Sequence, residues 1–327
     1  MTRKIIHKYN SIISIENLLD AWQEFLRGKR NKKDVQEFER NLMSNILSLH
    51  NDLNSRNYKH SRYEAFKVND PKPRDIHKAL VRDRLLHHAV YRILYPYFDK
   101  KFSASSFSCR INKGTYKSGK YFRRCFLKES KNNTRTCWVL KCDIKKFFAN
   151  INQHILIEIL QKDIEDNDLL KLLKEIISSF NSGREGVGLP LGNLTSQLFV
   201  NIYMNEFDKF VKHKLKAKNY VRYCDDFVIL SHDRKYLENI LVGIRKFLSE
   251  KLKLELHPDK VSIKTFASGV DFLGWVHFSD HKVLRTVTKR RMLKRFREVD
   301  FKEETKQSYL GLLKHGNTFK IKNKFLI

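Results

Sequence analysis

The sequence predicts an α+β fold, because segments with helical periodicity and segments typical of strands follow one another along the chain. Apolar residues recur at helical spacing near the N-terminus, whereas residues 136–144 and 221–230 are rich in β-branched, aromatic and aliphatic side chains. Of 327 residues, 41% are hydrophobic and 12% aromatic, which is ample material for a buried core.

Residues 1–60 are expected to be helical. Their apolar side chains form two stripes at helical spacing, one containing Ile15, Leu18, Leu19, Trp22 and Phe25 and the other containing Phe38, Leu42, Ile46 and Leu49. A basic turn at residues 28–33 separates the stripes. The pattern favours a docking pair of helices.

The most informative stretch is residues 221–230, where two adjacent carboxylates, Asp225 and Asp226, stand between two apolar runs. This predicts a strand, a tight turn that carries the acids, and a second strand. Asp is also common in solvated turns, but both flanks are apolar enough to be buried strands. Adjacent carboxylates repel each other, and two divalent cations would remove that repulsion. Because paired Mg²⁺ ions serve phosphoryl transfer, the stretch indicates a nucleotidyl transferase.

A polymerase site of this kind needs a third carboxylate from another strand. The β-prone run 136–144 supplies one in Asp143, close to its end. An N-cap for the helix that residues 151–160 suggest is the alternative. Together with the acidic pair, metal ligation is the favoured interpretation.

Between these acids, residues 186–197 are expected to form a loop, because they include three glycines and one proline. Small residues of this kind let the backbone approach a ligand closely. Leu198, Ile202 and Phe210 then fit a helix, capped by Thr195 or Ser196. The order of strand acid, glycine loop with helix, and acidic hairpin is far more specific than any one part.

In this order the motifs resemble those of the reverse transcriptases, and more narrowly those of diversity-generating retroelements within the group II intron-like superfamily. The resemblance runs over residues 66–316, on motifs at 70–76, 83–89, 106–115, 142–148, 189–197, 223–226, 256–260, 272–274 and 308–311. Most reverse transcriptases carry Gln before the loop glycine and Ser-Pro after it. Leu191 before Gly192, and Ser196 followed by Gln197, are what set the diversity-generating lineage apart.

The resemblance implies a right-hand polymerase fold with fingers, a palm built on an antiparallel sheet, and a short helical thumb. The expected ranges are 1–60 for an N-terminal helical extension, 61–135 and 151–190 for the fingers, 136–150 and 191–275 for the palm, and 276–327 for the thumb.

It also implies a catalytic centre. Asp143 and Asp225 would hold two Mg²⁺ ions, for which Mn²⁺ can substitute, with Asp226 nearby and the main-chain carbonyl of Ile144 as a further ligand. One ion would lower the pKa of the primer 3′-hydroxyl, and the other would neutralise charge on the leaving pyrophosphate.

The residues expected at the incoming dNTP are Lys72, Arg74, Phe148, Leu191, Gly192 and Lys260. Ordinary basic surface is the alternative for Lys72 and Arg74. Either Phe147 or Phe148 bars a ribose 2′-hydroxyl while its neighbour enters the core. The residues expected at primer and template are Arg110, Asn193, Gln197, Tyr223, Phe272, Leu273 and Gly274. Phe272, Leu273 and Gly274 resemble a primer grip. The alternative is a hydrophobic core, and the same residues could serve both roles.

Charge supports a nucleic-acid partner, since 65 Lys and Arg against 36 Asp and Glu give a net charge of +29, spread over the whole length. The basic turn at residues 28–33 could then contact the template. No apolar run approaches the ~20 residues of a membrane span, and no secretory signal is evident. The five cysteines form no Cys-x-x-Cys pair, so reduced thiols are expected in a cytoplasmic protein of bacterial or phage-encoded origin.

The function predicted from these features is RNA-directed DNA polymerisation, in which a template-repeat RNA is copied into cDNA with errors at adenines for targeted gene diversification. Leu191 cannot form the hydrogen bond that an amide would offer at this position, which could lower fidelity. The expected partners are template RNA, the cDNA/RNA duplex, dNTPs and a basic, ring-forming accessory variability protein. The alternatives are a retron, group II-derived or phage-defence (antiviral) reverse transcriptase, or an inactive RNA-binding scaffold.

Overall fold

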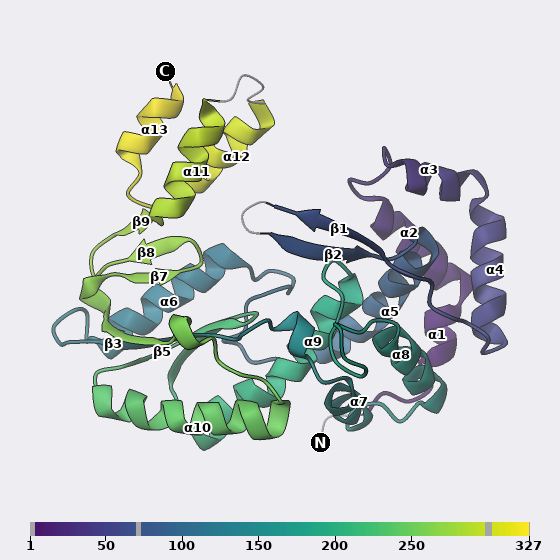
Figure 1. Ribbon diagram of the computed structural model, residues 1–327, viewed down its shortest axis with the longest axis horizontal. Helices are drawn as coiled ribbons and strands as arrows, with labels where there is room; N and C mark the ends of the chain where they lie inside the picture. The colour runs from purple at the N-terminus through teal and green to yellow at the C-terminus, as the bar shows by residue number, and fades with distance from the viewer. Residues whose placement is uncertain (1–3, 70–72, 298–302, 327) are drawn as a thin grey trace.

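The computed structural model describes residues 4–69, 73–297 and 303–326 and confirms the predicted α+β class. Helices α1–α4 form one side of the molecule and α11–α13 the other, and a two-stranded hairpin, β1–β2, projects between them (Figure 1). The central sheet, β4-β5-β3-β6, lies below the β7–β9 meander, on the same side of the molecule as α11–α13.

The N-terminal region packs four helices around Trp22, which is fully buried. Its ring lies 5.5 Å from that of Phe25 and 5.2 Å from that of Phe38. The second apolar stripe is not one helix, because the chain leaves helical geometry at Asn41 (φ −118°, ψ 38°). The helices are α1 (Tyr9–Ile13), α2 (Ile15–Leu26), α3 (Lys33–Arg40) and α4 (Leu42–Asn54).

The next segment joins this helical region to the sheet. The strands β1 and β2 pair antiparallel, and α5 packs against both α2 and α9. The elements are β1 (Glu64–Val68), β2 (Arg74–Lys78), α5 (Val81–Asp99), α7 (Gln153–Gln161), α8 (Asn167–Ser178), α9 (Leu194–Lys209) and the π-helical turn η2 (Phe210–Lys214).

The central sheet is antiparallel throughout and is covered on both faces. Side chains that alternate along its strands divide between two cores: Leu140 and Phe227 join the large core with α9 and α10, whereas Val139 and Val228 pack towards α6. The elements are α6 (Thr115–Glu129), β3 (Trp138–Asp143), β4 (Asn219–Tyr223), β5 (Asp226–Ser231), α10 (Arg234–Leu252) and β6 (Ser262–Thr265), with the 3₁₀ turns η1 (Phe148–Asn150) and η3 (Pro258–Lys260).

The C-terminal region has a small core of its own, in which Trp275, Leu284, Met292, Leu313 and Ile321 are buried. The three strands form an antiparallel meander that leads into the helices. The elements are η4 (Phe266–Ser268), β7 (Val270–Phe272), β8 (Trp275–His277), β9 (Lys282–Leu284), α11 (Thr286–Phe296), α12 (Glu303–Leu313) and α13 (Phe319–Leu326). Among all helices in the described ranges, none is both long enough and apolar enough to cross a lipid bilayer.

A single glycine holds the C-terminal helices against this meander. A Cβ atom added at Gly316 would lie 2.1 Å from Cζ3 of Trp275, a side chain that is only 8% exposed. Gly316→Ala is therefore expected to destabilise the packing of the C-terminal helices by ~1–3 kcal/mol. Limited proteolysis should cleave the region after residue 285 faster than in the wild type.

Gly311→Ala is the matched control. Gly311 lies within α12, and a Cβ atom there would meet nothing within 4 Å. Because Ala is the better helix former by ~0.5–1 kcal/mol, this variant should resist proteolysis at least as well as the wild type. Equal resistance of the two variants would contradict the proposed packing role of Gly316.

Candidate active site

Two strands and one turn bring the three predicted carboxylates together. In the pairing of β3 with β5, Asp143 lies directly opposite Asp226. Cys224 and Asp225 form the loop of the β4–β5 hairpin, with Cys224 in the left-handed region at φ +59°. The amide of Ile144 donates a 3.2 Å hydrogen bond to the carbonyl of Asp225, so the end of β3 and the hairpin loop are tied to each other.

The carboxylates repel one another in a half-buried setting. Burial raises the pKa of Asp225, and the charge of Asp143 raises it further. Burial also raises the pKa of Asp226 to about 7; Asp143 and Asp225 add to this shift, and Lys141 opposes it. Excess negative charge therefore gathers at the ends of β3 and β5.

Two lysines offset part of this charge. Lys260 donates a 2.8 Å hydrogen bond to Oδ1 of Asp143, and Nζ of Lys141 lies 4.0 Å from Oδ2 of Asp226. Oδ1 of Asp226 is buried and has no hydrogen-bond partner among the residues described. A buried, unpartnered carboxylate oxygen is unfavourable and is a ready ligand for a cation.

The donor set suits a hard divalent cation, because Mg²⁺ is held in proteins by one or two carboxylates together with substrate oxygens. Within the described ranges, no group of three or more His, Cys, Asp or Glu side chains is placed so that it could hold a metal ion by itself. An open site of carboxylates that is completed by substrate fits both observations. The carbonyl of Ile144, at the same strand end, accepts no hydrogen bond from any described residue.

A cavity of about 410 Å³ adjoins the carboxylates. Asp143, Asp226 and Lys260 line it, together with three residues that the sequence reasoning missed: Lys141, Asp271 and Arg285. Lys141 donates to the carbonyl of Asp271, and the guanidinium of Arg285 pairs with the Asp271 carboxylate. Strand alternation could have revealed Lys141, which lies two residues before Asp143 on the same face of β3.

The glycine loop reaches β2. The amide of His77 donates a 3.2 Å hydrogen bond to the carbonyl of Leu191. Gly192 has φ +112°, and a Cβ atom there would lie 3.2 Å from Cγ2 of Ile76. Leu191 is half-buried, whereas Gly192 is exposed. Where the loop meets the β1–β2 hairpin, it therefore presents the apolar side chain of Leu191 and the exposed backbone of Gly192.

The helix after this loop begins earlier than expected. It starts at Leu194, with Asn193 in the N-cap position, so Thr195 and Ser196 lie inside the first turn and the prediction that either caps the helix is wrong. Both are buried in that turn. Asn193 is 3% exposed, and its Nδ2 has no partner among the described residues. Gln197 is half-buried in the same turn.

The two phenylalanines after Asp143 diverge, as adjacent side chains must. Phe147 is 4% exposed and belongs to the large core, whereas Phe148 is only half-buried at the margin of that core, and the rings are 5.6 Å apart. Phe148 is therefore the one available to a ligand.

The remaining candidates are dispersed. Arg74 is exposed at the start of β2, and Lys72 lies outside the described residues. Tyr223 is half-buried at the end of β4. Phe272 is fully buried, with its ring 5.1 Å from that of Phe122, so this side chain is core. Leu273 (φ +52°) and Gly274 (φ +84°) form the two-residue turn between β7 and β8.

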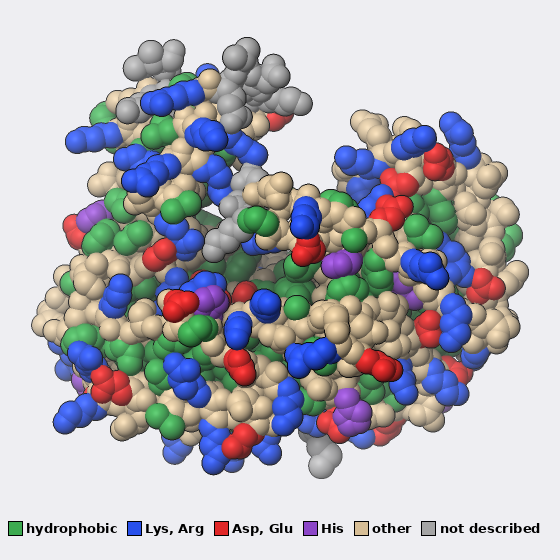
Figure 2. Space-filling model, viewed as in Figure 1, with side chains coloured by type: hydrophobic (Ala, Val, Ile, Leu, Met, Phe, Trp, Pro, Cys, Tyr) green, Lys and Arg blue, Asp and Glu red, His purple; other side chains and the backbone are tan. Residues whose placement is uncertain are grey.

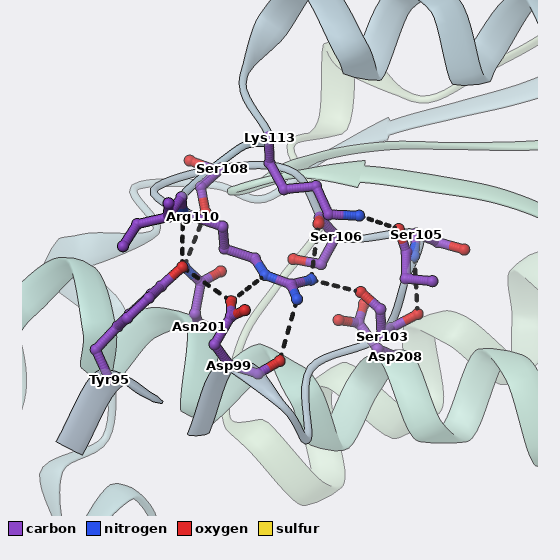
Figure 3. A network of polar contacts seen from close by, with 12 residues as sticks. Tyr95, Asp99, Ser103, Ser105, Ser106, Ser108, Arg110, Lys113, Asn201 and Asp208 are labelled. Carbon is purple, nitrogen blue, oxygen red and sulfur yellow. Dashed lines mark hydrogen bonds and ion pairs between the residues drawn. The ribbon is translucent and has the colours of Figure 1, made fainter. Parts of the chain in front are cut away.

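Arg110, expected at primer or template, is turned inwards (Figure 3). Its guanidinium binds the side chain of Asp99 at 2.6 Å and the carbonyls of Ser103 and Ser106 at 2.7 and 3.0 Å. Its side chain is only 6% exposed. In this structure Arg110 stabilises the serine-rich segment 103–113, and its guanidinium donates hydrogen bonds to groups of the protein.

The acidic hairpin is in turn supported by a buried ion pair that the sequence reasoning missed. Arg222 and Asp208, 1% and 0% exposed, form a two-pronged contact at 2.8 and 2.7 Å. Arg222 also donates to the carbonyl of Cys224 at 3.1 Å and to Oγ of Ser106 at 3.0 Å. A charged residue inside an apolar strand was the available signal, since buried charges are almost always paired.

The raised pKa of Asp226 leads to a pH prediction for the protein without divalent cations. An aspartate whose pKa is near 7 when folded and near 3.8 when unfolded costs stability as pH rises through that window. Asp226→Asn removes this cost. The variant should therefore melt ~2–4 °C above the wild type at pH 8, and the difference should shrink towards pH 4.

Thermal unfolding from pH 4 to 8, with EDTA and then with Mg²⁺, measures this. Mg²⁺ should raise the melting temperature of the wild type more than that of Asp226→Asn. A melting-temperature difference that does not change with pH would contradict the pKa assignment.

Comparisons with known proteins agree with this arrangement. A family model described as reverse transcriptase (RNA-dependent DNA polymerase) matches residues 67–277. The chain is 26% identical over 245 residues to Protein YkfC of Escherichia coli, covering 63% of this chain and 61% of that protein. It is 25% identical over 292 residues to the group II intron-encoded protein LtrA of Lactococcus lactis subsp. cremoris, covering 69% and 47%. With a yeast COX1/OXI3 intron 2 protein included, the chain spans between 34% and 61% of the length of these relatives.

Among solved structures, apo telomerase from Candida Tropicalis is similar, with a TM-score of 0.52 and 14% identity, over 77% of this chain and 52% of that chain. This likeness concerns the fold, and it confirms the right-hand polymerase architecture predicted from the sequence.

Proposed function

The chain belongs to the reverse transcriptase family, and we propose that it is an RNA-directed DNA polymerase whose catalytic residues are Asp143, Asp225 and Asp226. The observation that carries the proposal is the register that sets Asp143 opposite Asp226, with Asp225 in the adjoining loop. The raised pKa values of Asp225 and Asp226 and the unpartnered oxygen of Asp226 support a site for divalent cations.

Two Mg²⁺ ions, when bound, would supply acidification of the primer 3′-hydroxyl and neutralisation of the leaving pyrophosphate. Asp143 and Asp225 would hold them, with Asp226 close by and the Ile144 carbonyl as a further ligand. Lys260, now on Asp143, would be released by the arriving positive charge. Its ammonium group would then be free to stabilise the departing pyrophosphate.

The incoming dNTP would occupy the space between this centre and the β1–β2 hairpin, where the molecular surface is hollowed (Figure 2). Phe148, half-buried, would lie under the sugar and exclude a 2′-hydroxyl. Leu191 and Gly192 would border the nucleotide from the loop that touches β2. Arg74, exposed on that hairpin, would contact the triphosphate, as would Lys72.

The same proposal assigns regions. Residues 61–135 and 151–190 act as fingers, 136–150 and 191–275 as palm, and 276–327 as thumb, with 1–60 as an extension. Template RNA and the growing RNA/cDNA duplex would lie between α11–α12 and β1–β2, where the space-filling surface is hollowed (Figure 2). Asn193, Gln197, Tyr223 and the turn at Leu273 and Gly274 are the proposed primer and template contacts.

Asp225→Asn should lower dNTP incorporation on an RNA template by ~10³-fold or more, since charge stabilisation by the metal ions is worth several kcal/mol. Primer extension with Mg²⁺ measures the rate, and RNA affinity should not fall. Glu238→Gln, which alters an exposed carboxylate on α10, is the control and should extend primers normally. Persistent extension by Asp225→Asn would place the active site elsewhere.

A finer proposal concerns the lineage. Leu191 before Gly192 and Gln197 after Ser196 favour a diversity-generating retroelement enzyme, which copies a template-repeat RNA with errors at adenines and works with a basic, ring-forming accessory protein. The similarity to LtrA favours a second candidate, a reverse transcriptase derived from group II introns.

Leu191 offers a test of the low fidelity that belongs to the first candidate. Leu191→Gln restores an amide beside the nucleotide and should reduce misincorporation opposite template adenine about fivefold, the ratio that a hydrogen bond of ~1 kcal/mol gives. Sequencing of cDNA copied from a defined RNA measures it. Leu191→Met keeps an apolar side chain and should retain the wild-type error spectrum. An unchanged spectrum in Leu191→Gln would remove Leu191 from the explanation of fidelity.

A further inference from the structure

A second cavity lies on the opposite face of the β7–β9 meander from the candidate active site. It has a volume of about 260 Å³ and is lined by residues of α6, the end of β8 and the β8–β9 turn: Gly119, Lys120, Arg123, His277, Asp280, His281 and Lys282. None of these residues lines the cavity at the carboxylates. We name it the α6–β9 pocket.

Strand register shows that the two cavities are separate. His277 and Lys282 are paired across β8 and β9, so their side chains share one face of the meander. His277 packs edge-on against Phe122 of α6, which identifies that face as the one covered by α6. Val270 is the residue paired with His277. Asp271, the next residue along β7, therefore faces the other way, and it lines the cavity at the candidate active site.

The pocket concentrates cations without matching anions. Among the described residues, no carboxylate forms an ion pair with Lys120, Arg123 or Lys282. Neutral groups hold these cations instead. Lys120 lies 4.5 Å from the centre of the Tyr116 ring, Lys282 lies 4.8 Å from that of Trp275, and Arg123 donates to the carbonyl of Phe278. The one acid of the lining, Asp280, pairs with its neighbour His281 at 2.8 Å.

The electrostatics reflect this imbalance. Burial lowers the pKa of Lys282, and the charge of Lys120 lowers it further. Burial also lowers the pKa of Arg123, which Asp280 only partly offsets. The pKa of His277 falls to about 4, through burial first and then through Lys282 and Arg123, so this side chain is neutral near pH 7. A bound anion would relieve the repulsion among the three cations.

We propose that the α6–β9 pocket binds a backbone phosphate of a single nucleic-acid strand outside the polymerase cleft. A guanidinium and two ammonium groups are the usual partners of phosphate oxygens. The volume lies below the ~300–1,000 Å³ of typical small-molecule sites, which favours one phosphate over a whole nucleotide.

Charge beyond the pocket favours a strand over a small anion. On α6, three further basic residues, Lys117, Arg124 and Lys128, are exposed. From β9 the chain enters α11, whose 11 residues include five Lys or Arg and no acid. Figure 2 shows Lys and Arg side chains gathered over the C-terminal helices. Basic charge that extends from a pocket along two helices suits a linear polyanion.

The test measures the affinity of the full chain for a fluorescent single-stranded RNA at several salt concentrations. The double variant Lys120→Gln with Lys282→Gln should weaken binding roughly tenfold and reduce the salt slope by about one. The matched control is Lys246→Gln with Lys251→Gln, which removes the same charge from exposed positions on α10 and should leave affinity near that of the wild type. Because the readout is binding, it does not depend on polymerase activity.

A second variant guards against misfolding. Gly119 lies on α6, and among the described residues, apart from its own helix, an added Cβ would have only Cε1 of His277 within 4 Å, at 3.9 Å. Gly119→Asp should therefore place a carboxylate among the three cations. It should raise the melting temperature while weakening RNA binding, a combination that a damaged fold cannot give.

Three results would overturn the proposal. The first is equal RNA affinity in the pocket and control double variants, or no effect of Gly119→Asp on either readout. The second is binding of inorganic phosphate that depends on Lys120 and Lys282 while RNA binding does not, which would assign the pocket to a free anion. The third is the same dependence for poly-glutamate alone, which would assign it to an acidic protein.

Discussion

The antiparallel register of β3 with β5 is the constraint on which the candidate site depends. Asp143 meets Asp226 only in this register, and a slip by one residue would turn every side chain of the strand to the other face. The register is fixed by burial on both sides, because Leu140 belongs to the large core and Val139 to the core under α6. Hydrophobic packing thus holds three mutually repelling carboxylates where repulsion alone would separate them.

A buried ion pair stabilises the hairpin that carries two of those carboxylates. Arg222 and Asp208 are fully buried, and their ion pair is favourable only because hydrogen bonds satisfy the remaining donors. Two of those hydrogen bonds go to the Cys224 carbonyl in the hairpin loop and to Ser106. The left-handed loop residue, the buried pair and the serine-rich segment therefore form one connected network.

Local patterns in the sequence predicted the α+β class, the strand–turn–strand with Asp225 and Asp226, and the strand that ends at Asp143. Features that depend on distant contacts were not predictable in this way. The sequence does not indicate whether a basic residue in a motif faces a ligand or the protein. Arg110 turns inwards because Asp99 and two backbone carbonyls accept hydrogen bonds from it. Thr195 and Ser196 have the chemistry of caps but are buried. Asp271 and Arg285 reach the cavity through a meander whose position no local pattern encodes.

The serine-rich segment also pairs with the edge strand of the central sheet. β4 is an edge strand, and an exposed edge presents amides and carbonyls that can recruit another polypeptide. Here the amide of Phe107 donates to the carbonyl of Arg222, and the amide of Arg222 donates to the carbonyl of Ser105, so the segment runs parallel to β4 at this point and engages both backbone groups of Arg222. Those two groups are thereby closed to intermolecular β-pairing at the end of the strand that leads into the acidic loop, where such pairing would pull on the geometry of that loop.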